Sequence, residues 1–122
     1  MRKIINATQH SASTEQIAQG VVELPTKAKK RLQELLTFVS VPTSEEIEER
    51  AIQLAILIDI FSDNETNHCM VGGAPYLMGA LERRLKALGI TPLHAFTERV
   101  MSEDPVTGVK TSVFKHAGWV EV

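Results

Sequence analysis

Two adjacent glycines, Gly72 and Gly73, stand where a short apolar segment meets a predicted helix, and Pro75 follows at the first turn of that helix. Glycine lets the chain turn tightly and lets a ligand approach the main chain, while the first amides of a helix are unpaired and carry partial positive charge. The sequence therefore predicts a backbone anion site at Gly72, Gly73 and Ala74 that suits phosphate. The alternative is that the two glycines only make a tight connection.

Polar and aromatic candidates for the same site follow the other predicted strands. They are Thr8, Gln9 and His10 after the first strand, Phe96, Thr97 and Arg99 after the fourth, Tyr76 on the helix after the glycines, and Lys115 and His116 on the last strand. The carboxyl ends of parallel strands meet at one crevice, where the strand order reverses. We therefore expect these groups to converge there.

The residue types at this predicted crevice suit a nucleotide. Arg99 and the helix amides would hold phosphate, and Tyr76 or Phe96 would stack on a base. Gln9 or Thr97 would bind hydroxyls or base edges. The structural alternatives are that the two aromatic rings belong to the core and that Arg99 pairs with a neighbouring glutamate. On the last strand, His116 would add a titratable group beside the charged Lys115.

Motifs for catalysis or for a metal are weaker. The four histidines lack the pairwise spacing of a metal site, and Cys69 is the only cysteine, so neither a metal nor a cofactor is predicted. Ser11 beside His10 resembles a nucleophile–base pair only in composition, because adjacent residues on a strand point to opposite faces. Ser112 near His116 resembles such a pair no more closely. We predict no catalytic residue.

The elements that must position these groups alternate between strand and helix. Strands are expected at 3–7, 21–24, 68–71 and 93–97, helices after Ser13, Pro25, Thr43 and Ala74, and a closing hairpin from 98–100 and 110–122 around Asp104, Pro105 and Gly108. This alternation predicts one small α/β domain over residues 1–122. Its sheet would be mostly parallel, flanked by helices, and would end in an antiparallel hairpin.

Composition limits the classes of partner. A chain of 122 residues with 43% apolar content fits one domain, and a net charge of −2 argues against nonspecific binding to DNA or long RNA. The start of the chain lacks the apolar core of a signal peptide, and the run 51–61 is too short to cross a bilayer. We expect a cytoplasmic protein without a membrane partner.

The helix that begins after Thr43 carries an unusual second half. Thr43 and Glu46 have the spacing of a capping box, and apolar residues then cover nearly the whole circumference over 51–61. A helix that covers one face of a small domain needs less apolar surface than this. The sequence predicts a homo-oligomer formed through this helix, with complete burial inside the monomer as the alternative.

Three segments resemble small CRISPR-associated proteins of the CARF-like group, which bind and sometimes cleave cyclic oligoadenylates. They are Gly-Ala-Pro-Tyr-Leu-Met at 73–78, the segment 92–99 and the segment 110–116. The opening Ile-Ile-Asn-Ala-Thr-Gln-His at 4–10 and the Gly-Gly-Ala-Pro turn resemble still more closely the phage-encoded Thoeris anti-defence sponges of the first type. This resemblance implies a Rossmann or CARF-like fold. It also implies a protein that acts in the cytoplasm of an infected bacterial host and sequesters glycocyclic ADP-ribose intact.

Some of those sponges also hold cyclic di- or trinucleotides at a separate site within a hexamer, so the resemblance leaves a dimer and a hexamer open. Where CARF-like relatives carry Ser-His after the first strand, this chain has Thr8-Gln9-His10, which favours binding without chemistry. The leading hypothesis is a sponge for a cyclic nucleotide immune signal. The alternatives are a metal-independent ring nuclease and an accessory subunit that docks a partner protein through its apolar helix.

Overall fold

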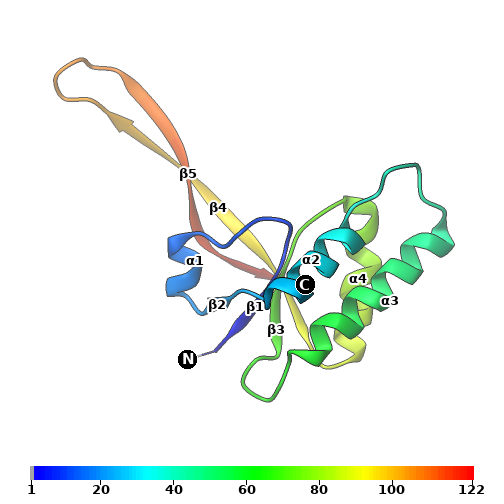
Figure 1. Cartoon of the computed structure of the whole chain (residues 1–122). Coiled ribbons are helices and arrows are strands. Elements are labelled where there is room, and N and C mark those ends of the chain that lie inside the picture. The colour runs from blue at the N-terminus through cyan, green and yellow to red at the C-terminus, as the bar shows by residue number, and fades with distance from the viewer. Residues whose placement is uncertain (1) are drawn as a thin grey trace.

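Short apolar segments form the centre of the sheet, and longer amphipathic segments form the helices (Figure 1). The computed structural model describes residues 2–122. The strands are β1 (Ile4–Ala7), β2 (Val21–Val22), β3 (His68–Val71), β4 (Thr91–Glu103) and β5 (Lys110–Glu121), and the helices are α1 (Thr14–Ala18), α2 (Thr26–Leu36), α3 (Ser44–Ile60) and α4 (Pro75–Ala87). The predicted small α/β domain with a C-terminal antiparallel hairpin is confirmed.

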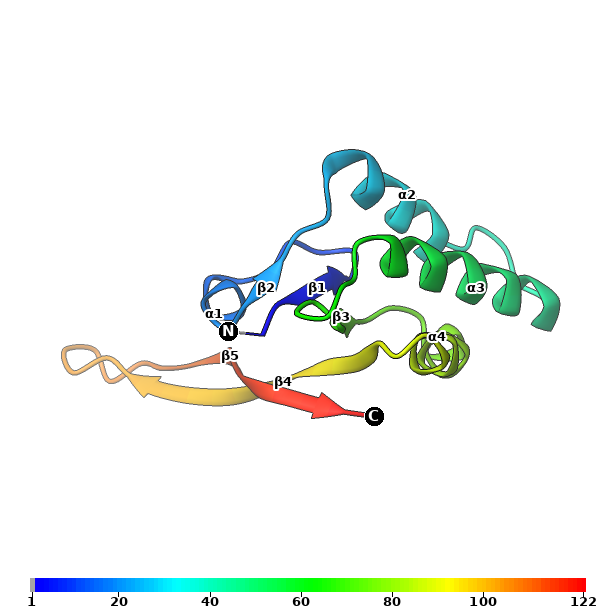
Figure 2. The same cartoon turned by 90° about the horizontal axis from the view of Figure 1, so that it is seen from below.

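The sheet is mixed, and its strands lie in the order β2-β1-β3-β4-β5. The first four strands are parallel, and β5 runs antiparallel to β4. From β1 the chain moves outward to β2 and then returns to place β3 on the other side of β1, so the strand order reverses between β1 and β3. Figure 2 shows the sheet curled like half of a barrel.

Two apolar clusters cover the two faces of the central strands. On one face Ile5 and Cys69 pack with α2, α3 and α4 in the main core, and on the other face Ile4 and Met70 pack with Leu93 in a smaller cluster near α1. In Figure 1 the three long helices accordingly lie to the right of β1 and β3, and α1 lies to the left. Burial raises the pKa of the Cys69 thiol to about 12, which keeps it protonated at neutral pH.

Side-chain caps begin two of the helices as predicted. The Ser13 hydroxyl accepts from the Gln16 amide, and the Gln16 side chain accepts from the Ser13 amide, which completes the capping box of α1. The Thr43 hydroxyl accepts from the Glu46 amide at the start of α3. Each of these caps satisfies an amide that the helix itself leaves unpaired.

Helix α3 buries one apolar face and exposes another. Its fully buried residues are Ala51, Leu54, Ala55 and Ile58. Ile56 is 54% exposed and Ile60 68% exposed, so complete burial inside the monomer, the alternative to self-association, is wrong. Among residues 2–122, no helix has the length and apolarity that a bilayer crossing requires.

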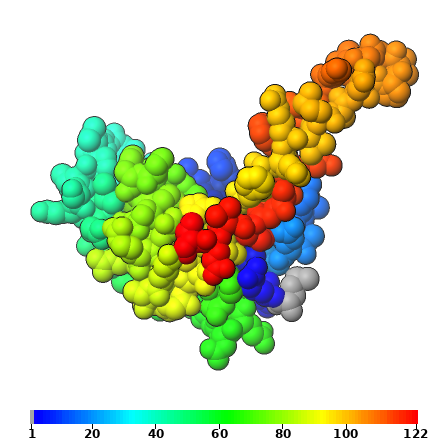
Figure 3. All heavy atoms as spheres, turned by 180° about the vertical axis from the view of Figure 1, so that it is seen from behind, coloured from blue at the N-terminus to red at the C-terminus, as the bar shows by residue number. Residues whose placement is uncertain are grey.

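The hairpin is longer than the sequence predicted. The expected strand at 93–97 and the expected hairpin arm at 98–100 are one continuous strand, β4, because its ladder with β5 runs on from Leu93 to Glu103. The turn follows Asp104, whose carboxylate accepts from the Val106 and Thr107 amides, and Gly108 takes a positive φ of 71°. The outer half of the hairpin extends away from the other strands as a two-stranded projection (Figures 1 and 3).

Candidate functional site

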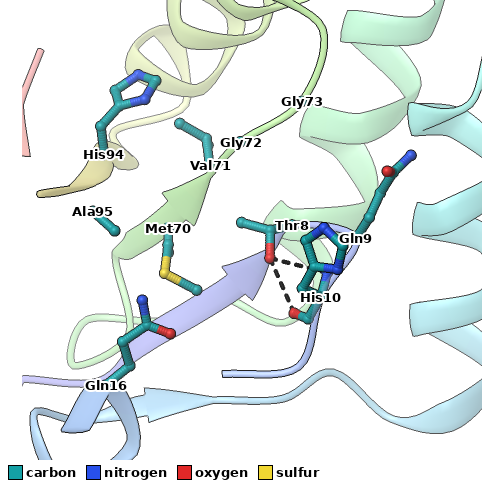
Figure 4. A pocket seen from close by; sticks show the side chains of 10 residues that line it. All are labelled: Thr8, Gln9, His10, Gln16, Met70, Val71, Gly72, Gly73, His94 and Ala95. Carbon is teal, nitrogen blue, oxygen red and sulfur yellow. Dashed lines mark hydrogen bonds between the residues drawn. The ribbon is translucent and has the colours of Figure 1, made fainter. Parts of the chain in front are cut away.

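A cavity of about 380 Å³ lies at the carboxyl ends of β1, β3 and the first part of β4. This is the point at which the strand order reverses, where open α/β sheets place their ligands. Figure 4 shows the residues that line it, which are Thr8, Gln9, His10, Gln16, Met70, Val71, Gly72, Gly73, His94 and Ala95.

Five of the predicted site residues meet at this cavity. The loop after β1 contributes Thr8, Gln9 and His10, and the loop after β3 contributes Gly72 and Gly73. The structure thus brings together two segments that lie more than sixty residues apart in the sequence. None of the ten lining residues carries a carboxylate, a lysine or an arginine, so the cavity offers amides, neutral polar groups and two imidazoles.

Half of the lining residues were not predicted. Met70, Val71 and Ala95 were expected only as strand residues, and Gln16 was expected only in a helix cap. His94 lies within a predicted strand and was not singled out. Its position one residue after the buried Leu93 was the available signal, because alternate residues of a strand face opposite sides of the sheet.

The buried side chain of Asn6 fixes the loop after β1. Its Oδ1 accepts from the Thr8 amide at 3.0 Å and from the Thr8 hydroxyl at 2.7 Å. Its Nδ2 donates to the His10 carbonyl at 2.8 Å and to the Glu23 carboxylate at 2.9 Å. Because a buried amide is costly without partners, these four bonds tie the shape of the loop to the end of β1.

Glu23 holds the far end of the same loop. Its carboxylate accepts from the Ala12 amide at 2.7 Å and from Lys29 Nζ at 3.1 Å, in addition to Asn6. Burial alone would raise the pKa of Glu23, but the hydrogen bonds from Ala12, Asn6 and Lys29 together lower it below the ordinary value of 4.5. The loop is therefore anchored by an ionised group at neutral pH.

The glycine pair allows the two loops to approach each other. A Cβ on Gly72 would lie 3.3 Å from Thr8 Cγ2, and Gly73 takes a φ of 154°, which other residues rarely adopt. Helix α4 then begins after Ala74, which has no side-chain cap, and Pro75 at its first position has no amide to satisfy. The backbone that borders the cavity thus continues into the positive end of a 13-residue helix.

His94 connects the cavity to α4. Its Nε2 lies 2.6 Å from Glu82 Oε1, and both side chains are partly buried, with exposures of 33% and 21%. A carboxylate at this distance fixes the orientation of the imidazole ring. His10, in the loop after β1, and His94, in the first part of β4, both line the cavity (Figure 4).

Two predicted residues near the start of α4 do not line the cavity. Ala74 lies between Gly73 and the helix. Tyr76 lies instead in a second hollow of about 520 Å³, where its ring packs edge-on against Phe38 with centroids 5.4 Å apart. Its position on the first turn of α4 directs it toward the 38–42 segment, which the sequence pattern did not reveal.

The remaining predicted residues follow the hairpin away from the cavity. Phe96 and Thr97 come directly after Ala95, Arg99 stands opposite Phe114 in the ladder, and Lys115 stands opposite Glu98. His116 Nε2 lies 2.9 Å from Gln19 Oε1, and its ring centroid is 4.5 Å from that of Trp119. None of these five residues lines the cavity, because the expected strand and the expected hairpin arm form one strand, β4, that continues outward.

Within residues 2–122, the structure shows no cluster of three or more His, Cys, Asp or Glu side chains that could hold a metal ion. The family model described as the Uncharacterized protein MJ1673 family matches residues 2–120, and the chain belongs to this family. No curated protein and no solved structure matches the chain.

Proposed function

We propose that this member of the MJ1673 family binds a cyclic nucleotide immune signal of the ADP-ribose type and sequesters it without cleaving it. The observation that carries the proposal is the cavity between the 8–10 loop and the glycine pair, at the reversal of the strand order. Its volume of about 380 Å³ lies in the range of small-molecule sites. The resemblance to Thoeris anti-defence sponges and to CARF-like proteins supports the choice of ligand.

The chemistry of the lining fits such a ligand in two parts. The amides that follow Val71 and the imidazole of His10 would hold the pyrophosphate, since helix-terminal amides favour anions. Gln9 and Gln16 offer hydrogen bonds to ribose hydroxyls or to an adenine edge, and Met70 offers an apolar contact to the base. The hydrogen bonds of Asn6 hold the 8–10 loop in place, so binding should lose little conformational freedom.

Sequestration requires affinity and no turnover. A sponge acts by mass action, so a submicromolar dissociation constant, worth more than about 8 kcal/mol, is sufficient if the protein outnumbers the signal. In an infected bacterial cell this would keep the signal from its effector. A strand order with its reversal beside β1 supports the proposed Rossmann or CARF-like relationship.

The test is retention and release. The purified chain is mixed with glycocyclic ADP-ribose or, separately, with cyclic oligoadenylates, freed of unbound ligand, denatured by heat and analysed by mass spectrometry. The proposal predicts intact ligand in stoichiometric amount. A Val106→Ser variant, altered at the exposed hairpin tip, is the matched control and should retain as much. Absence of retention for every ligand would contradict the proposal and favour docking of a partner protein.

One observation favours a second candidate, a metal-independent ring nuclease. His94, oriented by Glu82, shares the cavity with His10. In a cyclic oligoadenylate, His94 would take the proton of a ribose 2′-hydroxyl, and that oxygen would attack the adjacent phosphorus. The 5′-oxygen would leave with a proton from His10, which opens the ring and leaves a 2′,3′-cyclic phosphate. Linear products that exceed the protein in amount, and that disappear in a His94→Gln variant, would establish this activity in place of sequestration.

A further inference from the structure

The outer part of the hairpin, residues 97–116, forms an arm that lies outside the apolar clusters of the domain. Figure 3 shows the arm standing clear of the rest of the molecule, and Figure 1 shows it continuing β4 and β5 past the end of β3. It nevertheless carries large apolar side chains. Phe114 is 72% exposed, Met101 60% and Val113 50%.

Both faces of the arm carry these side chains. The register places Arg99 opposite Phe114 and Met101 opposite Ser112, so Met101 and Phe114 are diagonal neighbours on one face. Val100 stands opposite Val113 on the other face. A two-stranded ribbon is marginally stable alone in water, and in the described sheet no third strand pairs with this one. The arm therefore has apolar surface that the monomer leaves in water.

The total surface of the chain supports this interpretation. A compact monomer of 13.5 kDa is expected to expose about 6,500 Å². This chain exposes 7609 Å². The excess, about 1,100 Å², is close to the roughly 800 Å² that each partner buries in a stable protein–protein interface. The molecule thus exposes about one interface more than a compact monomer does.

We infer that the arm is a homodimerisation element and that the Met101–Phe114 face packs on the same face of a second copy about a two-fold axis. Arg99 lies toward the base of this face, and Glu103 lies toward its tip, where Lys110 stands opposite it. When two arms pack antiparallel, the base of each meets the tip of the other, so Arg99 comes near the Glu103–Lys110 pair of the second copy. A two-fold axis thus packs the apolar Met101–Phe114 face on itself, as interfaces between identical chains do.

The inference is tested by sedimentation equilibrium of the full chain and of two arm variants. In the double variant Met101→Thr and Phe114→Glu, threonine favours a strand and glutamate stands opposite Arg99, so the ladder itself is retained. We expect a wild-type dimer and at least a hundredfold weaker dimerisation in the variant, with an unchanged far-ultraviolet circular dichroism spectrum.

A second variant remains informative if the double substitution fails to fold. Because Glu98 stands directly opposite Lys115, residues 99–114 can be replaced by Asn-Gly, which closes a two-residue hairpin turn. This shortened chain should be a folded monomer. The control is Ile56→Lys on the exposed face of α3, which should leave the dimer intact.

Three results would each overturn the inference. The first is a wild-type chain that is monomeric at 100 µM, a concentration roughly a hundredfold above a micromolar dissociation constant. The second is a shortened chain that still dimerises. The third is dissociation of the dimer caused by Ile56→Lys. The last of these would assign the interface to α3, as the apolar pattern of that helix alone predicts.

Discussion

One continuous strand, β4, runs through both the domain body and the arm, yet the two regions are stabilised in different ways. Near its start, Leu93 is 2% exposed and packs in an apolar cluster, whereas on the opposite strand of the arm Phe114 is 72% exposed. In the body, apolar residues are buried by their own chain. In the arm, cross-strand pairs are the main support within the monomer.

This difference indicates what each region is for. The body fixes the cavity, because the ends of β1 and β3 and the start of α4 are held by a continuous core. The arm adds little to that core, and its exposed apolar side chains form the proposed interface. Substitutions in the body should therefore change stability or ligand binding, and substitutions in the arm should change assembly.

The largest contrast is expected between core and arm truncations. Leu81→Ala removes a fully buried side chain from the main cluster and should lower the free energy of unfolding by about 2–5 kcal/mol. Met101→Ala on the arm should change it by less than about 0.5 kcal/mol in the monomer. Urea denaturation at a protein concentration below dimerisation measures both values. Equal losses would show that the arm belongs to the same cooperative core.

Loss of the buried polar side chain of Asn6 should lower the free energy of unfolding almost as much as loss of the buried apolar side chain of Leu81. Asn6→Ala removes four hydrogen bonds, three of them to the 8–12 loop and one to Glu23, and should cost about 2 kcal/mol, since the Thr8 amide and the His10 carbonyl lose their partner. Hydrogen exchange of the amides at 8–12 should accelerate in the variant. Asn64→Ala, in the exposed loop before β3, is the control and should leave exchange in this loop as it is in the wild type.

Ligand affinity should decrease when a cavity residue is substituted and should stay nearly unchanged when an arm residue is substituted. His10→Ala, at the cavity, should weaken binding of the cyclic ADP-ribose ligand about tenfold, which corresponds to about 1.4 kcal/mol. Arg99→Ala, on the arm, should leave the dissociation constant within about twofold. Calorimetric titration measures both. A loss of affinity greater than twofold for Arg99→Ala would show that Arg99 contributes to the binding site, as the sequence pattern alone predicted.

Substitution of Glu23 should change stability less than substitution of Asn6, and this change should depend on pH. Because the pKa of Glu23 is lowered in the folded chain, its contribution is complete above pH 4.5 and is lost as the pH falls through the lowered pKa. Glu23→Gln should cost about 1 kcal/mol at pH 7. Thermal unfolding of wild type and variant from pH 7 to pH 3 should show this difference shrinking below pH 4.5. A difference that is constant over this range would show that the charge of Glu23 is not what anchors the loop.

The sequence predicted the parts of the molecule that depend on local patterns. The capping residues Ser13 and Thr43 and the alternation of strand and helix follow from short-range rules. The meeting of Gly72–Gly73 with the Thr8 loop follows from a rule of topology, because the carboxyl ends of parallel strands lie together. The arm did not follow, because nothing local distinguishes a strand that ends at the sheet from one that continues past it. His94 was not predicted as a site residue because its partner Glu82 lies on a different element, which a local sequence pattern does not reveal.

The proposed binding site is tested most directly by following the amide chemical shifts along the chain during titration with glycocyclic ADP-ribose. We expect the largest shifts at residues 8–10 and 72–74 and at Ala95, around the cavity at the reversal of the strand order. Saturating shifts confined to the arm, or to the hollow formed by Phe38 and Tyr76, would contradict this expectation.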